Sequence, residues 1–271
     1  MNIQLVTIDI DGTLLNSQRQ ILPEVKAAIK KAQDQGVKIV LCTGRPLTGV
    51  KGFLKELGLT GPNNYVATYN GSVVETTEGK TITAHALTYD DFLYIEAMSR
   101  KVNIPLHTHV VEPPRLLCTN KNINKYSVFE AFLVDIPLMY RTPEEITPEE
   151  KIIKMMYIDD SKNLAPALEK LPAEFYEKYT CVRSEEFFFE ILNKQASKGQ
   201  ALLDLCTYLN ISPENTMAIG DNENDLSMIQ AAKIGVAMGN AVENVKNHAD
   251  FITKTHDEAG VAYALEKFVL N

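Results

Sequence analysis

The sequence predicts an α/β protein with a parallel β-sheet, into which a second domain of different character is inserted. Short apolar runs that end in polar residues occur near both ends of the chain, and helical patterns lie between them. Between about residues 84 and 190 this alternation stops, and short β-like and helix-like runs mix instead. We therefore expect a core domain of residues 1–83 and 191–271 and an inserted α+β domain of residues 84–190.

The first apolar run, residues 3–8, predicts a buried strand that ends in Asp9 and Asp11. Ligands of open α/β sheets bind outside the carboxyl ends of the strands, so both carboxylates fall where a substrate would bind. Residues two apart on an extended segment face the same side, and two such carboxylates repel unless a cation neutralises them or one holds a proton. A strand followed by an ordinary Asp-Gly turn is the alternative.

A helix and a second strand follow. Residues 23–35 carry apolar side chains at helical spacing, with a proline at the start and a glycine just past the end. Residues 37–42 predict a buried strand that ends at Thr43 and Gly44. Because a right-handed crossover makes consecutive strands of this kind parallel, Thr43 is expected at the same sheet edge as Asp9.

The segment up to residue 83 continues the core. Residues 50–58 favour a helix and residues 65–69 a short strand. Asn70-Gly71 is a strong turn signal, and the runs around it predict a hairpin.

Within the inserted segment, His107 and His109 would share one face of an extended run. A metal-binding pair is conceivable. Plain strand surface is the expectation, because no third ligand lies nearby in the sequence.

The core pattern resumes after residue 190. Residues 201–209 predict a helix with Lys198 at its N-terminal end, where a cation opposes the helix dipole. An ordinary solvated lysine is the alternative. Residues 216–219 predict a third buried strand, and polar residues again follow it: Asp221, Asn224 and Asp225. Either of the last two could simply cap the next helix.

Composition limits the function. The net charge of −8 over 271 residues argues against electrostatic binding to nucleic acid or to an anionic membrane. Four cysteines lie far apart without a Cys-x-x-Cys pair, which argues against a structural zinc site or a disulfide framework. The chain opens directly into a strand, and it contains no apolar run of about 18 residues. We expect a cytoplasmic protein without a membrane partner; the sequence gives no indication of oligomeric state.

The segment Asp9-Ile-Asp11-Gly-Thr13 resembles the first motif of the haloacid dehalogenase superfamily, and three further signatures follow in the family's order. Thr43-Gly44 is similar to the second motif and Lys198 to the third. Gly220-Asp-x-x-Asn-Asp225 is similar to the fourth, in the form typical of the Cof-like sugar-phosphatase branch. The resemblance implies a Rossmann-like core with an inserted α+β cap of the C2B type.

The resemblance also implies the roles of these residues. Asp9 would be the nucleophile and Asp11 the general acid/base. Mg²⁺ would be bound by Asp9, by the main-chain carbonyl of Asp11 and by Asp221, with Asp225 at the same metal site. The phosphoryl group would be held by four residues: Thr43, Gly44, Lys198 and Asn224.

We therefore expect a magnesium-dependent phosphatase that hydrolyses small phosphorylated metabolites, sugar phosphates first among them, through an aspartyl-phosphate. A phosphosugar mutase with the same intermediate and a ligand-binding regulator that lost catalysis are the alternatives. Residues 84–190 contain 12 Lys and Arg against 18 Asp and Glu. An acidic lid repels polyanions, so neither nucleic acids nor phosphoproteins are expected as partners.

Overall fold

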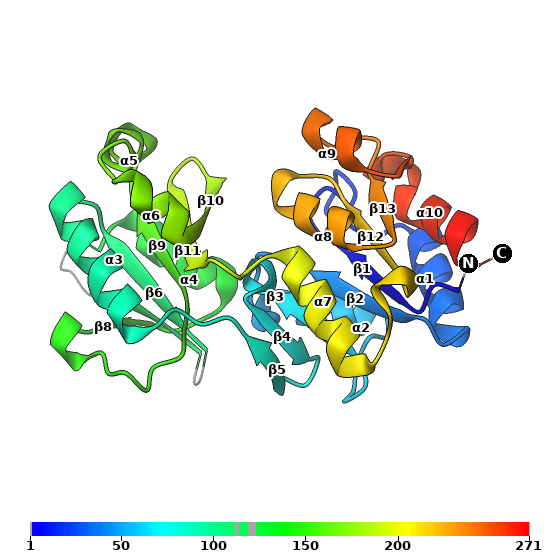
Figure 1. Ribbon diagram of the computed structural model, residues 1–271, viewed down its shortest axis with the longest axis horizontal. Helices are drawn as coiled ribbons and strands as arrows, with labels where there is room; N and C mark the ends of the chain where they lie inside the picture. Colours follow the sequence, from blue (N-terminus) through cyan, green and yellow to red (C-terminus); the bar gives the residue numbers. More distant parts are fainter. Residues whose placement is uncertain (1, 112–113, 119–122, 271) are drawn as a thin grey trace. The chain divides into compact units, whose positions relative to one another are not determined.

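A computed structural model describes residues 2–111, 114–118 and 123–270 (Figure 1). Contacts between Cα atoms divide the chain into two compact units. The core unit comprises Met1–Thr83 and Ser197–Asn271, and the inserted unit comprises Ala84–Ala196. In the described part of the chain, none of the helices has both the length and the apolar character that a membrane crossing requires.

The core unit contains an eight-stranded sheet of order β14-β13-β12-β1-β2-β3-β4-β5. The six strands from β14 to β3 are parallel, and β4 is antiparallel to β3. This arrangement confirms the predicted α/β class. The strands span Leu5–Ile8 (β1), Lys38–Cys42 (β2), Tyr65–Thr68 (β3), Val73–Thr76 (β4), Thr81–Ala84 (β5), Thr216–Gly220 (β12), Ile234–Ala237 (β13) and Phe251–Ile252 (β14).

Helices cover both faces of this sheet. Successive residues of β1 point to opposite faces, so Val6 packs with Ile29 of α1 and Leu265 of α10, while Leu5 packs with Leu202 of α7. Strands buried on both sides must be apolar along their whole length, which explains the uninterrupted apolar runs of the sequence. The helices span Pro23–Asp34 (α1), Lys51–Glu56 (α2), Lys198–Leu209 (α7), Leu226–Ala231 (α8), Glu243–His248 (α9) and Gly260–Phe268 (α10).

The inserted unit has its own sheet of order β10-β11-β9-β6-β7-β8, antiparallel except for the parallel pair β7 and β8. Its core packs α3 and α6 against one face. The strands span Leu106–Val110 (β6), Arg115–Cys118 (β7), Leu138–Tyr140 (β8), Ile152–Ile158 (β9), Tyr179–Glu185 (β10) and Phe188–Asn193 (β11). The helices span Tyr89–Val102 (α3), Lys125–Val134 (α4), Ser161–Leu168 (α5) and Ala173–Lys178 (α6).

One predicted boundary differs from the structure. Residue 190 was expected to end the inserted domain, but it lies within β11, which pairs with β9 and β10 of the inserted sheet. The unit therefore continues to Ala196.

The prediction that His107 and His109 lie on plain strand surface is wrong. Both side chains are buried, and their strand β6 lies inside the sheet between β9 and β7. Glu130 of α4 lies 3.5 Å from Nε2 of His109. Burial, and then the charge of Lys154, lowers the pKa of His107 to about 3, so the imidazole is neutral. Among the described residues, neither histidine belongs to a group of three or more potential metal ligands.

Gly71 provides a test of how the core unit joins its two chain segments. Its φ is +87°, and a Cβ atom there would lie 2.1 Å from the carbonyl oxygen of Ser197, just before α7. Gly36 has nearly the same φ, +86°, with open space around the Cβ position. We expect Gly36→Ala to lower the free energy of unfolding by about 1 kcal/mol, the cost of a left-handed conformation. Gly71→Ala should cost at least about 2 kcal/mol more, because it adds a clash.

Urea titration followed by circular dichroism measures the free energy of unfolding of both variants, whose substitutions lie in the same core unit. Equal losses would contradict the close approach of Gly71 to Ser197.

Candidate active site

Three parallel strands of the core sheet end at one edge, and each is followed by a polar residue. The register of β1 with its neighbours pairs Ile8 with Leu41 and with Ile219. Asp9 is the first residue after β1, Thr43 the first after β2 and Asp221 the first after β12, so the three residues leave the sheet at the same end. The backbone N–H of Asp9 donates to the carbonyl of Ile219 at 3.0 Å, which fixes the start of the loop after β1.

Lys198 is buried at this edge. Its Nζ lies 2.5 Å from Oδ1 of Asp9 and 2.5 Å from Oδ1 of Asp225. The side chain is 1% exposed, which excludes the alternative of a solvated surface lysine. Ser197 caps α7 by accepting a hydrogen bond from the backbone N–H of Gln200, so the helix can begin at Lys198 despite the unfavourable dipole.

The charges of this cluster are strongly coupled. Burial raises the pKa of Asp9 well above its ordinary value and the charge of Asp225 raises it further, while Lys198 opposes both. For Lys198 burial favours the neutral form, but the carboxylates of Asp225 and Asp9 outweigh it, so its pKa is raised. Lys198 is therefore a cation, and it is the charge that favours the ionised form of Asp9.

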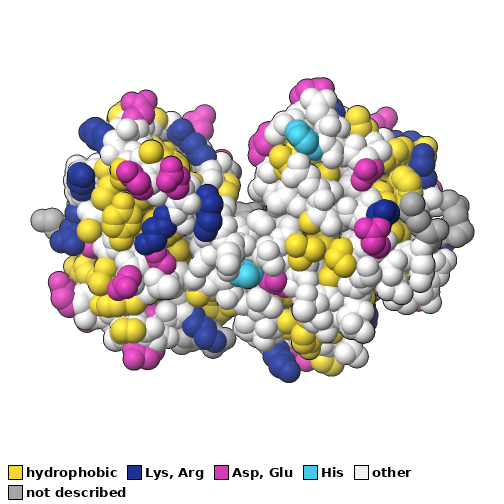
Figure 2. Space-filling view, in the orientation of Figure 1, with side chains coloured by type: hydrophobic (Ala, Val, Ile, Leu, Met, Phe, Trp, Pro, Cys, Tyr) yellow, Lys and Arg dark blue, Asp and Glu magenta, His cyan; other side chains and the backbone are white. Residues whose placement is uncertain are grey.

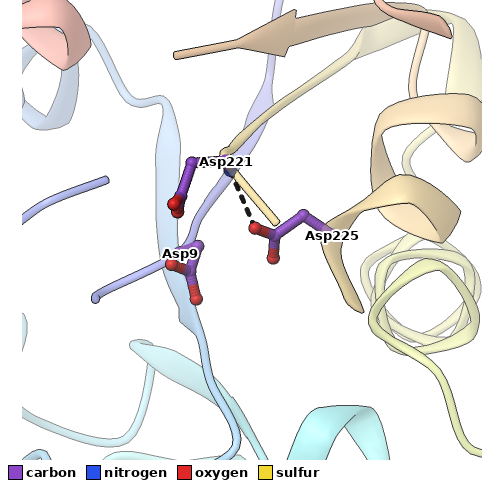
Figure 3. A group of neighbouring side chains, drawn as sticks. All are labelled: Asp9, Asp221 and Asp225. Carbon is purple, nitrogen blue, oxygen red and sulfur yellow. Dashed lines mark hydrogen bonds between the residues drawn. The ribbon is translucent and has the colours of Figure 1, made fainter. Parts of the chain in front are cut away.

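Asp225 uses both of its carboxylate oxygens inside the protein. Oδ1 contacts Lys198, and Oδ2 accepts hydrogen bonds from the backbone N–H groups of Asp221 at 2.8 Å and Asn222 at 3.0 Å. Figure 3 shows the bond from Asp221. The capping alternative is wrong for the helix that begins at Leu226, because the Asp225 side chain makes no cap hydrogen bond to it. Asp225 instead completes a capping box in the short 3₁₀ helix Glu223–Asp225, whose N-cap is Asn222. Asp225 therefore orients Lys198 and the loop after β12.

Three carboxylates meet at the site. Asp9, Asp221 and Asp225 each offer an oxygen atom, and these atoms lie within 4.8 Å of one another. Figure 3 shows the three side chains directed toward one another. Burial, and then the charge of Asp225, raises the pKa of Asp221 to about 6. Oδ1 of Asp221 also accepts a hydrogen bond from Thr13 at 2.9 Å.

The cluster fits a hard divalent cation such as Mg²⁺. Oxygen ligands and crowded negative charge are what this ion requires. Gly12 makes the approach of Asp221 possible, because its φ is +85° and a Cβ atom would lie 2.4 Å from Oδ2 of Asp221. Both oxygens of Asp225 already have partners, so Asp9 and Asp221 are the side chains of this group that could hold such an ion.

Asp11 lies apart from this cluster. Its side chain is 50% exposed, and Arg45 donates to both of its oxygens, from Nη2 to Oδ1 at 2.6 Å and from Nε to Oδ2 at 3.0 Å. The expected crowding of Asp9 by Asp11 is therefore wrong, because the carboxylates that raise the pKa of Asp9 belong to Asp225 and Asp221. Sequence reasoning missed Arg45, although an arginine directly after Thr43-Gly44 was a signal.

The remaining predicted residues follow two of the same strands, Thr43 and Gly44 after β2 and Asn224 after β12. Thr43 is 2% exposed, and its Oγ1 accepts from the backbone N–H of Arg45 at 3.2 Å. A Cβ atom on Gly44 would meet the side-chain amide of Asn70 at 3.2 Å, and the Asn224 amide donates to Oδ1 of Asn70 at 3.1 Å. Asn70 thus links Gly44 to Asn224. It was predicted only as part of a turn, and its left-handed φ of 56° is what carries it to this place.

Comparison with known proteins agrees with this geometry. Residues 6–265 match the family of haloacid dehalogenase-like hydrolases. A protein of Streptococcus pyogenes serotype M6, named as a candidate phosphatase, is 44% identical over the full length of both chains. The crystal structure of a haloacid dehalogenase-like hydrolase from Bacteroides thetaiotaomicron is 31% identical, with a TM-score of 0.82 over 98% of this chain and 99% of that one.

A third relative has a named activity. The structure of a sugar phosphatase of subclass IIB of the same superfamily is 25% identical, with a TM-score of 0.79 over 99% of this chain and all of that chain.

The buried ion cluster predicts unequal effects of two neighbouring acidic residues on stability. Asp225→Ala should lower the free energy of unfolding by about 3 kcal/mol, because it leaves the Lys198 ammonium with one carboxylate and two backbone N–H groups without their acceptor. Glu223 lies two residues away and is exposed. Glu223→Ala should change the free energy of unfolding by less than about 0.5 kcal/mol. Urea unfolding of both variants checks this, and similar small losses would refute the structural role of Asp225.

Proposed function

The chain belongs to the haloacid dehalogenase-like hydrolases and is a phosphatase, and on that premise we propose its mechanism and its class of substrate. We propose a magnesium-dependent hydrolysis of small phosphorylated metabolites, sugar phosphates first among them, through an aspartyl-phosphate on Asp9. The observation that carries the proposal is the buried Lys198 ammonium, 2.5 Å from Asp9 at a sheet edge that also holds Asp221.

In the first step, an oxygen of Asp9 attacks the phosphorus atom while the bond to the leaving oxygen breaks. Asp11 donates its proton to that oxygen, so the product leaves as an alcohol. In the second step, a water molecule gives a proton back to Asp11 and attacks the phosphorus of the aspartyl-phosphate. Inorganic phosphate leaves, and the Asp9 carboxylate is restored.

Stabilisation of charge is the larger part of this catalysis. Lys198 neutralises Asp9 and the transferring phosphoryl group, and it is already in place before the substrate arrives. The Thr43 hydroxyl, the Gly44 N–H and the Asn224 amide are assigned to the other phosphoryl oxygens. The Asp9 and Asp221 carboxylates and the Asp11 carbonyl would hold Mg²⁺, and the ion would add positive charge that stabilises the transferring phosphoryl group.

Two observations support small metabolites as substrates. The relative of subclass IIB acts on sugar phosphates. On the face shown in Figure 2, Lys and Arg side chains are scattered among Asp and Glu rather than gathered into the basic track that a polyanion needs. The four cysteines are free thiols, which supports a place in the reducing cytoplasm.

The proposal is tested with the purified protein and Mg²⁺ on p-nitrophenyl phosphate and a panel of sugar phosphates. Release of one inorganic phosphate per sugar consumed is expected. An isomerised sugar phosphate without free phosphate would indicate a mutase. If no compound of the panel, p-nitrophenyl phosphate included, releases phosphate, the proposal is overturned.

The metal assignment predicts different effects for two aspartates of the site. Asp221→Asn should weaken Mg²⁺ binding at least about tenfold, because it removes a charged oxygen ligand. Asp11→Asn should change the affinity less than about threefold, since its carboxylate faces Arg45 rather than Asp9. Isothermal titration with Mg²⁺ measures both. Equal losses of affinity would show that the Asp11 side chain, and not only its carbonyl, binds the ion.

A further inference from the structure

We propose that Arg45 is a positioning residue for the proton transfer: it holds the Asp11 carboxyl group where Asp11 can reach the leaving oxygen. The inference rests on the proposed function, in which Asp11 is the general acid and base. It assigns to Arg45 a specific part of the reaction, protonation of the leaving group, rather than a general part in binding phosphate.

The hydrogen bonding between the Arg45 and Asp11 side chains is bidentate. Nη2 and Nε of Arg45 each donate to a different oxygen of Asp11, at 2.6 Å and 3.0 Å. A planar guanidinium that binds both oxygens fixes the plane of the carboxylate as well as its position. A lysine ammonium is a point charge and cannot fix that plane.

Arg45 is itself held in place. Its backbone N–H donates to Thr43 and its carbonyl accepts from the backbone N–H of Tyr69 at 3.2 Å. Its guanidinium carbon lies 5.7 Å from the centre of the Phe53 ring, within the range of a cation–π contact. The backbone of Arg45 is therefore held by the residues that follow β2 and β3, and its guanidinium lies against Phe53 of α2, before any substrate binds.

Asp11 needs such a partner. Half of its side chain is exposed, and within the described ranges its carboxylate receives hydrogen bonds from Arg45. A half-exposed carboxylate without a partner would occupy several rotamers, and only a fraction of them would reach the leaving oxygen. Because Asp11 gives a proton in the first step and takes one in the second, its placement matters twice per turnover.

The inference predicts a dependence on the leaving group. p-Nitrophenolate is a stable anion and leaves with little help from an acid, whereas an alkoxide must be protonated as it leaves. Loss of Arg45 should therefore damage the hydrolysis of an alkyl phosphate far more than that of p-nitrophenyl phosphate. A purely structural defect, or weaker phosphate binding, would reduce both rates alike.

The experiment compares glucose 6-phosphate with p-nitrophenyl phosphate in the full-length protein with Mg²⁺. For Arg45→Gln we expect kcat/KM to fall about 30-fold on the sugar phosphate and less than about threefold on the aryl phosphate. For Arg45→Lys, kcat/KM on the sugar phosphate should lie between the values of Arg45→Gln and the wild type. Arg19→Gln, at an exposed arginine of the same unit, is the control and should change neither rate.

A double-mutant cycle tests whether Arg45 acts through Asp11. In an Asp11→Ala background, Arg45→Gln should lower kcat/KM for the sugar phosphate by less than about twofold, because the residue it positions is gone. Equal losses on the two substrates, or a full additional loss in the Asp11→Ala background, would overturn the inference. A wild-type protein that releases no phosphate would overturn the proposed function together with it.

Discussion

A lysine ammonium buried between two carboxylates is the interaction on which the rest of this site depends. Transfer of an isolated Lys198 charge into the protein would cost several kcal/mol, and only close, well-oriented partners offset that cost. Asp9 and Asp225 supply them at 2.5 Å. Because Asp9 follows β1, Lys198 begins α7 and Asp225 follows β12, one ion cluster joins the two chain segments of the core unit. It also leaves the proposed nucleophile beside a permanent cation.

The parallel sheet makes this cluster possible, and glycines make it compact. Strands in register place their following loops at one edge, so side chains from distant parts of the chain meet there. A Cβ atom on Gly220 would lie 2.4 Å from the Cβ of Asp225, and one on Gly12 would lie equally close to the Asp221 carboxylate. Side chains at either position would push carboxylates out of the site. The positions of these charged groups thus depend on two uncharged residues, Gly12 and Gly220.

The sequence predicted the strands and helices, which carry periodic apolar patterns, and missed the contacts that depend on the conformation of individual loops. The apolar strands and the helix at residues 23–35, observed as Pro23–Asp34, follow from which faces are buried. The contact between Asp11 and Arg45 and the place of Asn70 depend on loop conformations that periodicity does not encode. The contact of His109 with Glu130 depends on α4, which is distant in sequence. Prediction therefore brought Asp9, Lys198, Asp221 and Asp225 together at the carboxyl ends of the strands, as the structure does, and missed the partners of Asp11 and Asn224.

The central claim is that Asp9, held beside Lys198, becomes covalently phosphorylated. The most direct measurement is mass spectrometry of the Asp11→Ala variant, acid-quenched during turnover of p-nitrophenyl phosphate with Mg²⁺. Without the base that activates water, the intermediate should accumulate. We predict a peptide containing residues 3–14 that is heavier by one phosphoryl group, with the group on Asp9. Phosphate release without any phosphorylated peptide, or a phosphoryl group on a different residue, would contradict the account.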